Sequence, residues 1–251
     1  MFDENNRLAL PGCLHRISAA RGRGGAVIGL TYRVGRHAPG AAAPLRDVLA
    51  LVAAAHRGAA PGAPSLLLLG RPGVGKTTLL RDVARYFSED AGLAVVVVDG
   101  SNEIAGDGDE PHPCIGRALR LQVPRHREQW EVMMEAVANH GPDVVVVDEI
   151  TTPSEAHAAR QIAARGVVLV ATAHGTALPD VLRNPDLARL AGGVTAVTLG
   201  DEAARRGRGG AKTRLERAGA PVFPVLVEMA GRGACRLHLS VAGSVDCLLA
   251  G

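Results

Sequence analysis

One stretch limits the folds available to this chain more than any other, residues 66–80 with the sequence LLLLGRPGVGKTTLL. A run of leucines is followed by a glycine-rich turn and then by a helical pattern. Gly70, Gly75, Lys76 and Thr77 fit G-x-x-x-x-G-K-[ST], the pattern of a phosphate-binding loop (P-loop). Glycines lack a Cβ, so the backbone N–H groups of such a turn can converge on a polyphosphate. The stretch therefore predicts a strand, a P-loop and a helix.

The residue types in the loop suit a nucleotide bound with Mg²⁺. Lys76 is expected to reach the β and γ phosphates as a point charge, and the Thr77 hydroxyl is an expected Mg²⁺ ligand. The helix that begins here would offer its N-terminal N–H groups to the anion. A glycine turn without a ligand is the alternative. The predicted nucleotide-contacting residues are Gly70, Arg71, Pro72, Gly73, Val74, Gly75, Lys76, Thr77 and Thr78.

A second signal is the apolar run Val144–Ile150, VVVVDEI, in which two adjacent carboxylates follow four valines. Burying two acids costs free energy, so we expect them at the open end of a strand. Asp148 fits a Walker B ligand of Mg²⁺ or of its waters, and Glu149 fits the base that orients an attacking water. The alternative is an acid pair that faces solvent.

From Ser65 onward, apolar runs alternate with helical patterns, which is typical of a parallel sheet buried on both faces. Only 2% of the residues are aromatic, so Val, Leu and Ala must fill the core. We predict strands at Leu66–Leu69, Ala94–Val98, Val144–Asp148, Val167–Thr172 and Val194–Leu199, with a short extra strand at Arg120–Val123. We predict helices near Gly75–Ser88, Arg127–Asn139, Ser154–Ala164 and Leu178–Leu182.

One predicted strand, Ala94–Val98, lies between the P-loop strand and the strand with the acid pair. This insertion is typical of the P-loop proteins with a catalytic glutamate, whose usual strand order is 5-1-4-3-2. In that order the Val167–Thr172 strand lies beside the P-loop strand, and His174 just after it faces the γ-phosphate. His174 is therefore a candidate sensor of phosphate or water, and a capping or core histidine is the alternative.

The fold class is thus α/β, a P-loop NTPase with a mostly parallel sheet flanked by N- and C-terminal β-hairpins. Residues 1–60 are expected to form a hairpin rich in arginine and a linker helix, residues 61–200 the ATPase core, and residues 201–251 a mobile basic loop and a final hairpin. The crossovers should be right-handed, with the ligand at the carboxyl ends of the strands.

The segment Asp99–Gly116, DGSNEIAGDGDEPHPCIG, is unusually polar. Its D-G-D resembles part of a Ca²⁺ loop, but no glutamate stands at the twelfth position. Asp99 or Glu103 could contact Mg²⁺ waters or position the nucleophile, or the segment could contact a neighbouring subunit.

The cysteines and the net charge limit which cellular compartments and binding partners the sequence predicts. The four cysteines show no C-x-x-C pairing, so we expect free thiols in a reducing compartment. There is neither a signal peptide nor a stretch of twenty apolar residues. A formal net charge of +3 does not by itself imply a nucleic-acid partner.

Several segments together carry a resemblance to a known family, from about Leu8 to His238. They are GRPGVGKTTLLRDVAR, VDGSNEIAGDGDEPHPCIGRALRLQVP, VVVVDEI, RGVVLVATAHGTAL and VTLGDEAAR. The chain resembles the stage III sporulation protein AA-like ATPases, and more closely their cyanobacterial and plastid-lineage relatives. That family is related to the ring-forming ATPases of type II and type IV secretion.

The resemblance implies ATP hydrolysis with Mg²⁺ in a ring, expected to be a hexamer, with nucleotide between subunits. By this resemblance, Asp99 and Glu103 correspond to the family's Asp box and His174 to its His box. The expected catalytic residues are then Lys76, Glu103, Glu149 and His174. The expected metal ligands are Thr77 and Asp148. Arginines would complete a neighbour's site, and the candidates are Arg33, Arg36, Arg117, Arg120 and Arg125. Relatives commonly add an N-terminal extension and a C-terminal Arg-x-x-x-His nucleic-acid-binding domain, and the end of this chain shows no such motif.

The sequence features suggest three hypotheses for the function of the chain. The leading hypothesis is ring-coupled ATP hydrolysis that does mechanical or assembly work, in bacterial cytoplasm or in chloroplast stroma. The alternative is a single-stranded nucleic-acid-binding protein switched by ATP, motivated by the basic N-terminal hairpin and by Arg205–Arg217. The aromatic residues Tyr32, Tyr86 and Trp130, however, do not cluster as stacking platforms would. A small-molecule kinase is disfavoured by the placement of Glu149 and by the lack of an arginine-rich lid between Asp148 and His174.

Overall fold

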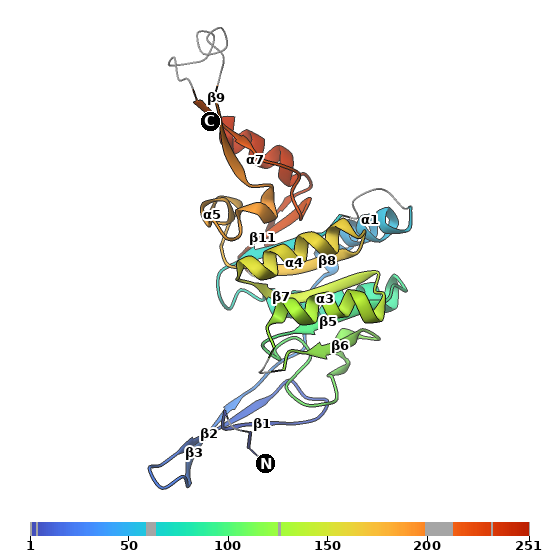
Figure 1. The fold of residues 1–251 in the computed structure, drawn as a ribbon. Helices are drawn as coiled ribbons and strands as arrows, with labels where there is room; N and C mark the ends of the chain where they lie inside the picture. The colour runs from blue at the N-terminus through green and yellow to red at the C-terminus, as the bar shows by residue number, and fades with distance from the viewer. Residues whose placement is uncertain are drawn as a thin grey trace. The chain divides into compact units, whose positions relative to one another are not determined.

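The computed structural model describes residues 2–3, 5–58, 64–124, 127–198, 213–231 and 233–250 (Figure 1). The chain forms two compact units. Unit 1 consists of Met1–Ala59 and Gly75–Asp148, and unit 2 of Ala60–Val74 and Glu149–Gly251. The P-loop therefore begins in unit 2 and ends in unit 1, and the acid pair is divided between the two units.

The central sheet of unit 1 contains strands β5 (Val95–Asp99) and β6 (Leu119–Gln122) and, up to Asp148, strand β7 (Val144–Ile150), in the order β7-β5-β6. Both strand pairs are parallel, with Val95 opposite Val144 and Val96 opposite Leu119. Strand β5 is buried along its whole length, as expected for an apolar run covered on both faces. The helical elements of unit 1 are η1 (Ala43–Leu45), α1 (Arg46–Arg57), α2 (Lys76–Arg85), a π-helical turn η2 (Tyr86–Asp90), η3 (Pro113–Ile115) and α3 (Gln129–His140).

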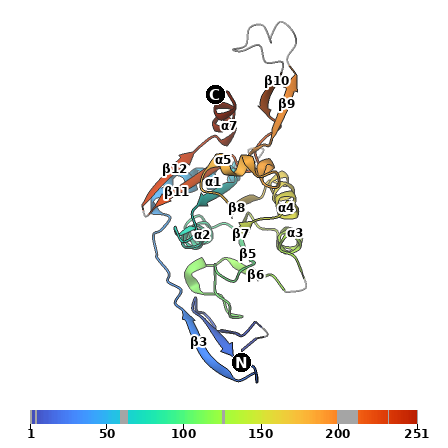
Figure 2. The ribbon, with the colours of Figure 1, turned by 90° about the vertical axis from the view of Figure 1, so that its left-hand side faces the viewer.

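An antiparallel sheet precedes α1 and contains β1 (Arg7–Ala9), β2 (Arg16–Arg21) and β3 (Val27–Arg33), in that order. Figure 1 labels the three strands, and Figure 2 shows β3 from another side. Ile17 lies opposite Tyr32 and Ala19 opposite Leu30, whereas Arg16 lies opposite Arg33. Because side chains alternate along a strand, Ile17, Ala19, Leu30 and Tyr32 share one face of this sheet, and Arg16 and Arg33 share the other. We call the set Leu8, Ile17, Ala19, Leu30 and Tyr32 the apolar face.

The sheet of unit 2 contains β4 (Leu66–Gly70), β8 (Val168–Ala173), β11 (Val225–Gly231) and β12 (Ala234–His238) in the order β12-β11-β4-β8. Strand β4 is parallel to both neighbours, and β12 is antiparallel to β11. A separate antiparallel ribbon pairs β9 (Val194–Thr198) with β10 (Thr213–Arg217). The helical elements are α4 (Pro153–Ala164), α5 (Leu178–Arg183), η4 (Ala188–Ala191) and α7 (Val241–Ala250).

The predicted fold class is confirmed. In the expected order 5-1-4-3-2, the run 5-1-4 corresponds to β11-β4-β8 in unit 2 and the run 3-2 to β7-β5 in unit 1. The hairpins predicted at both ends are present as β2–β3 and β11–β12.

Two details of the prediction are wrong. The segment Val194–Leu199 was predicted as a strand of the parallel sheet, but β9 pairs with β10, and β11 lies beside the P-loop strand instead. Strand β9, with the sequence VTAVT, contains two threonines and is largely exposed, whereas a central strand needs apolar residues on both faces. The loop predicted over Asp201–Arg217 ends earlier, because Thr213–Arg217 form β10, and residues 201–212 lie outside the described residues.

Candidate functional site

The P-loop backbone adopts conformations that its glycines make accessible. Gly70 ends β4 with φ +152°, and a Cβ there would lie 2.9 Å from the Val74 side chain and 3.0 Å from Met229 Cβ. Gly73 and Gly75 have φ values of +76° and +108°, in the left-handed region. The Val74 N–H donates to the Arg71 carbonyl over 3.2 Å and tightens the turn. These positions explain why glycine recurs in the loop.

Helix α2 starts directly after the loop, with Gly75 as its N-cap. The Leu79 N–H donates to the Gly75 carbonyl over 2.9 Å, which closes the first helical turn. Lys76, Thr77 and Thr78 are thus the first residues of the helix and are half-buried. The first helical turn leaves backbone N–H groups without intrahelical acceptors, a property of anion-binding helix ends.

The two acids of β7 have different neighbours. Asp148 is half-buried in unit 1 and accepts a hydrogen bond from the Ser101 hydroxyl. Glu149 belongs to unit 2, where its Oε1 lies 3.7 Å from His174 Nε2. The His174 side chain is 70% exposed, so it is not a core histidine. The structure therefore brings together Glu149 and His174, two residues that the sequence placed in one site.

Several hydrogen bonds hold the turn that carries His174 and the residues after it. The Gly70 N–H donates to the Gly175 carbonyl over 3.0 Å, so the first P-loop glycine is bonded to this turn. Asp180 accepts from the Thr176 N–H and hydroxyl, each over 2.8 Å. These contacts with Thr176 hold the pKa of Asp180 below its usual range. Farther along, Glu228 of β11 accepts from the Leu178 N–H over 2.7 Å.

Asp99 shapes the acidic segment from inside. Its side chain is fully buried and accepts hydrogen bonds from the N–H groups of three residues of its own loop, at 3.0, 3.1 and 2.9 Å from Glu103, Ile104 and Ala105. Burial raises the pKa of Asp99, while the backbone donors oppose that shift. Both carboxylate oxygens thus accept hydrogen bonds from the loop backbone.

Glu103 is half-buried and forms an ion pair with Arg33 of β3. That contact lowers the pKa of Glu103, so its carboxylate is ionised at neutral pH. The Glu103 carbonyl accepts from Arg81 over 2.5 Å. The catalytic candidate of the Asp box is therefore held by other residues of unit 1.

The arginines considered for a neighbour's site differ in their contacts. Arg117 donates to the Ser88 carbonyl over 3.0 Å, and Arg120 donates to the carbonyls of Gly106 and Gly108 over 2.7 and 2.5 Å. Both guanidinium groups therefore serve to hold unit 1 together. Arg33 pairs with Glu103, Arg36 is exposed, and Arg125 lies outside the described residues.

Mg²⁺ usually binds through one or two protein oxygens together with substrate phosphates and waters. The Thr77 hydroxyl and the Asp148 carboxylate are oxygen donors of that kind. Within the described ranges, no group of three or more His, Cys, Asp or Glu side chains forms a metal-binding cluster. The four cysteine thiols are free, and no helix in the described part of the chain has the length and apolar character to cross a membrane.

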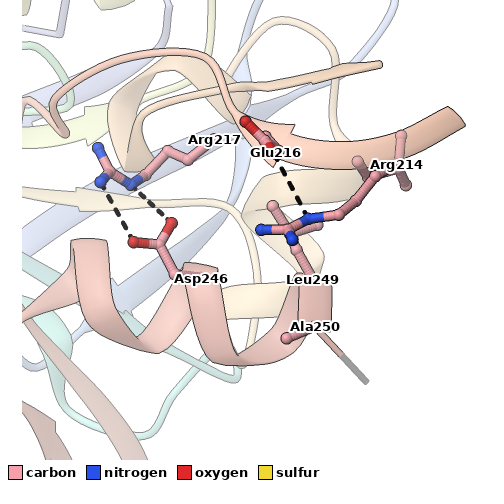
Figure 3. Close-up of a pocket in the computed structure, with 7 residues that line it drawn as sticks. Arg214, Glu216, Arg217, Asp246, Leu249 and Ala250 are labelled. Carbon is pink, nitrogen blue, oxygen red and sulfur yellow. Dashed lines mark hydrogen bonds and ion pairs between the residues drawn. The ribbon is translucent and has the colours of Figure 1, made fainter. Parts of the chain in front are cut away.

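A pocket of about 270 Å³ lies between β10 and α7 in unit 2 (Figure 3). Its two arginines are engaged by acids, Arg214 with Glu216 at 3.5 Å and Arg217 with Asp246 at 3.0 Å. None of the predicted site residues lines it. We therefore do not assign the nucleotide to this pocket.

Comparison with known proteins gives a family match. The family model described as sporulation stage III, protein AA, matches residues 41–196. The protein SEEDLING PLASTID DEVELOPMENT 1 of Arabidopsis thaliana is 50% identical over 250 residues, which cover 100% of this chain and 35% of that protein. The uncharacterized protein ycf45 of Cyanidium caldarium is 39% identical over 251 residues, which cover 100% of this chain and 71% of that protein.

A solved structure shares the fold. The pilus retraction motor PilT with bound ADP matches with a TM-score of 0.52 and 17% sequence identity, over 85% of this chain and 63% of that chain. At this identity the likeness shows the architecture, an α/β fold with a mostly parallel sheet and flanking hairpins.

Proposed function

Because the chain belongs to the sporulation stage III protein AA family, we propose that it is an Mg²⁺-dependent ATPase. The observation that carries the proposal is the placement of Glu149 at the end of β7, 3.7 Å from His174. A protein that only binds nucleotide needs no base at this position, whereas hydrolysis needs a group that activates water. A P-loop with glycines in the required conformations supports the binding step.

Each residue has a chemical task in this proposal. The loop 70–78 and Lys76 hold the phosphates, while Thr77 and Asp148 hold Mg²⁺. When bound, Mg²⁺ would neutralise charge that develops on the phosphate oxygens. Glu149 orients a water molecule and takes its proton as the water oxygen bonds to the γ-phosphorus and the bond to the β–γ bridging oxygen breaks. His174 donates a hydrogen bond to the γ-phosphate or the water, and Glu103 is the further catalytic candidate.

The proposal includes assembly into a homo-oligomeric ring, a hexamer, in which an arginine of one subunit contacts the nucleotide of its neighbour. The exposed side chains of the apolar face support association, because such patches on a protein surface mark interaction sites. The ring would do mechanical or assembly work on a protein or nucleic-acid substrate. The name of the Arabidopsis relative supports the chloroplast stroma over the bacterial cytoplasm.

Phosphate release from ATP by the purified protein tests the enzyme. Lys76→Ala removes the phosphate-binding cation, and Glu149→Gln removes the base but keeps its shape. We expect each variant to lose turnover by about 100-fold or more, the range of general-base catalysis. Glu149→Gln should still bind ATP, measured by the fluorescence of a labelled nucleotide.

Glu216→Gln is the control, since Glu216 lies on β10 and pairs with Arg214. Its turnover should stay within twofold of wild type. Wild-type turnover in both Lys76→Ala and Glu149→Gln would refute the assignment.

The alternative function, single-stranded nucleic-acid binding switched by ATP, rests on the basic N-terminal hairpin, whose Arg33 pairs with Glu103, and on the basic segment Arg205–Arg217. Of its basic residues, the structure describes Arg214 and Arg217, and both are engaged by acids (Figure 3). No observation therefore favours this function over hydrolysis. Affinity for single strands that falls steeply with salt would support it.

A further inference from the structure

Arg81 is a buried cation on the helix that follows the P-loop. Only 8% of the residue is exposed. Its guanidinium donates to three backbone carbonyls, those of Ile104 over 2.8 Å, Glu103 over 2.5 Å and Arg36 over 3.0 Å. A buried charge is costly unless its hydrogen-bonding groups are satisfied. Arg81 thus stays in place because two other segments, the acidic loop and the residues after β3, supply its acceptors.

Both backbone polar groups of Glu103, its N–H and its carbonyl, are hydrogen-bonded. Its N–H donates to Asp99 over 3.0 Å, and its carbonyl accepts from Arg81. Asp99 comes from the end of β5 and Arg81 from α2. Two rigid elements therefore fix the main chain of Glu103, and its side chain leaves from this fixed point toward Arg33.

We propose that Arg81 and Asp99 are positioning residues that place Glu103 relative to the P-loop helix. The proposal rests on the proposed function, in which Glu103 is a catalytic candidate. Arg81 and Lys76 share one helix, separated by about 7.5 Å of helical rise. A movement of α2 on nucleotide binding would therefore carry Glu103 with it.

The geometry also explains why the position needs arginine. A planar guanidinium presents five donors in a fixed fork, whereas a lysine ammonium is a compact, strongly hydrated group. Lysine at position 81 would keep the charge but could not reach carbonyls of Glu103, Ile104 and Arg36 together. The neighbouring arginine of the same helix, Arg85, instead contacts Asp82 and Asp90. It therefore offers a matched control.

Steady-state ATP hydrolysis tests the proposal with Arg81→Lys, Arg81→Met and Asp99→Asn. We expect kcat to fall about tenfold or more in each, with KM for ATP within twofold of wild type, because Lys76 and Thr77 are untouched. Arg85→Met should keep kcat within twofold. Adding Arg81→Met to Glu103→Gln should cause no further loss, because residues that act through one group are non-additive.

Hydrogen exchange gives a readout that does not depend on activity. The amides of Glu103, Ile104 and Ala105 should exchange at least tenfold faster in Arg81→Met and Asp99→Asn than in wild type or Arg85→Met. Unchanged exchange would overturn the proposal, as would faster exchange with wild-type kcat. Arg81→Lys and Asp99→Asn keep the test valid if Arg81→Met fails to fold, as judged by circular dichroism. If wild type releases no phosphate, the proposed function fails, while hydrogen exchange still decides whether Arg81 and Asp99 hold the loop.

Discussion

Asp82 is an acid in the interior of unit 1, with only 1% of the residue exposed. Its Oδ2 accepts from the Ala42 N–H over 2.8 Å, and its Oδ1 accepts from Arg85 Nε over 3.0 Å. Arg81 beside it donates to the carbonyl of Arg36. The adjacent pair Arg81–Asp82 therefore holds the segment between β3 and α1 at two points.

The protonation of Asp82 should make the free energy of unfolding depend on pH. Burial alone raises the pKa of Asp82, but the donors Ala42 and Arg85 outweigh burial, and the folded-state pKa lies below the usual range. An acid with such a lowered pKa stabilises the folded state at pH values above its unfolded-state pKa of about 3.9. This contribution is lost as the pH falls through the folded-state pKa. We expect Asp82→Asn to lower the free energy of unfolding by about 1–3 kcal/mol at pH 7.

Urea unfolding at pH 7, 5 and 3.5 measures this effect. The difference between wild type and Asp82→Asn should shrink toward the lowest pH, because protonated Asp82 loses its advantage over asparagine. Asp47→Asn on α1 is a control, since Asp47 is exposed and accepts from the N–H of the adjacent Val48 over 2.9 Å. A difference that stays constant with pH would contradict the role of the carboxylate charge.

At the scale of helices and strands, patterns of apolar residues were enough to predict most of the sheet. The runs LLLL, VVVV and VVVV became β4, β5 and β7 within one or two residues of their predicted bounds. Strand β11 was predicted only as half of a hairpin, since its pattern does not show that its second edge pairs with β4. Helix α7 was not predicted, because VAGSVDCLLA contains Gly and Ser and few charges that would mark a helical face.

The candidate site was predicted in part for a similar reason. Motif spacing identifies the loop 70–78 and the pair Glu149 and His174, because fixed residue types recur there. It does not show which charges become buried, so the contacts of Arg81 and the inward orientation of Asp99 emerged only from the structure. Burial depends on contacts between residues distant in sequence, and a single sequence does not contain them.

Helix α4 begins shortly after the acid pair and has a capping box at its N-terminus. Thr152 Oγ1 accepts from the Glu155 N–H over 3.2 Å, and Glu155 Oε2 accepts from the N–H groups of Thr151 and Thr152 over 2.7 and 3.0 Å. This capping box satisfies backbone donors at the helix N-terminus. Thr152→Ala should lower the stability by about 1 kcal/mol and the melting temperature by about 2–4 °C. Ser154→Ala, in the same exposed turn, should change neither, and equal losses in both variants would exclude a specific cap.

For the whole molecule, the N-terminal sheet raises the question of what covers its apolar face. Leu30 and Tyr32 of β3 are 47% and 63% exposed. Strand β3 is also an edge strand, and it contains neither lysine nor proline, the residues that commonly protect such edges. The opposite face is committed within the subunit, since it carries Arg33, which pairs with Glu103. In the ring that we propose, a neighbouring copy covers the apolar face.

Tyr32→Asp tests that assembly, because a charge buried in an apolar interface is costly. Light scattering should give wild type with ATP a mass that is a multiple of 25.9 kDa and give the variant the mass of a single chain. Thr31→Asp is the matched control, since Thr31 is exposed on the same strand but pairs with Ser18 on the arginine-bearing face. Because both substitutions place aspartate in β3, a loss of mass confined to Tyr32→Asp reports on the face and not on the strand. A monomeric wild type, or equal masses for the two variants, would show that the apolar face does not mediate self-association.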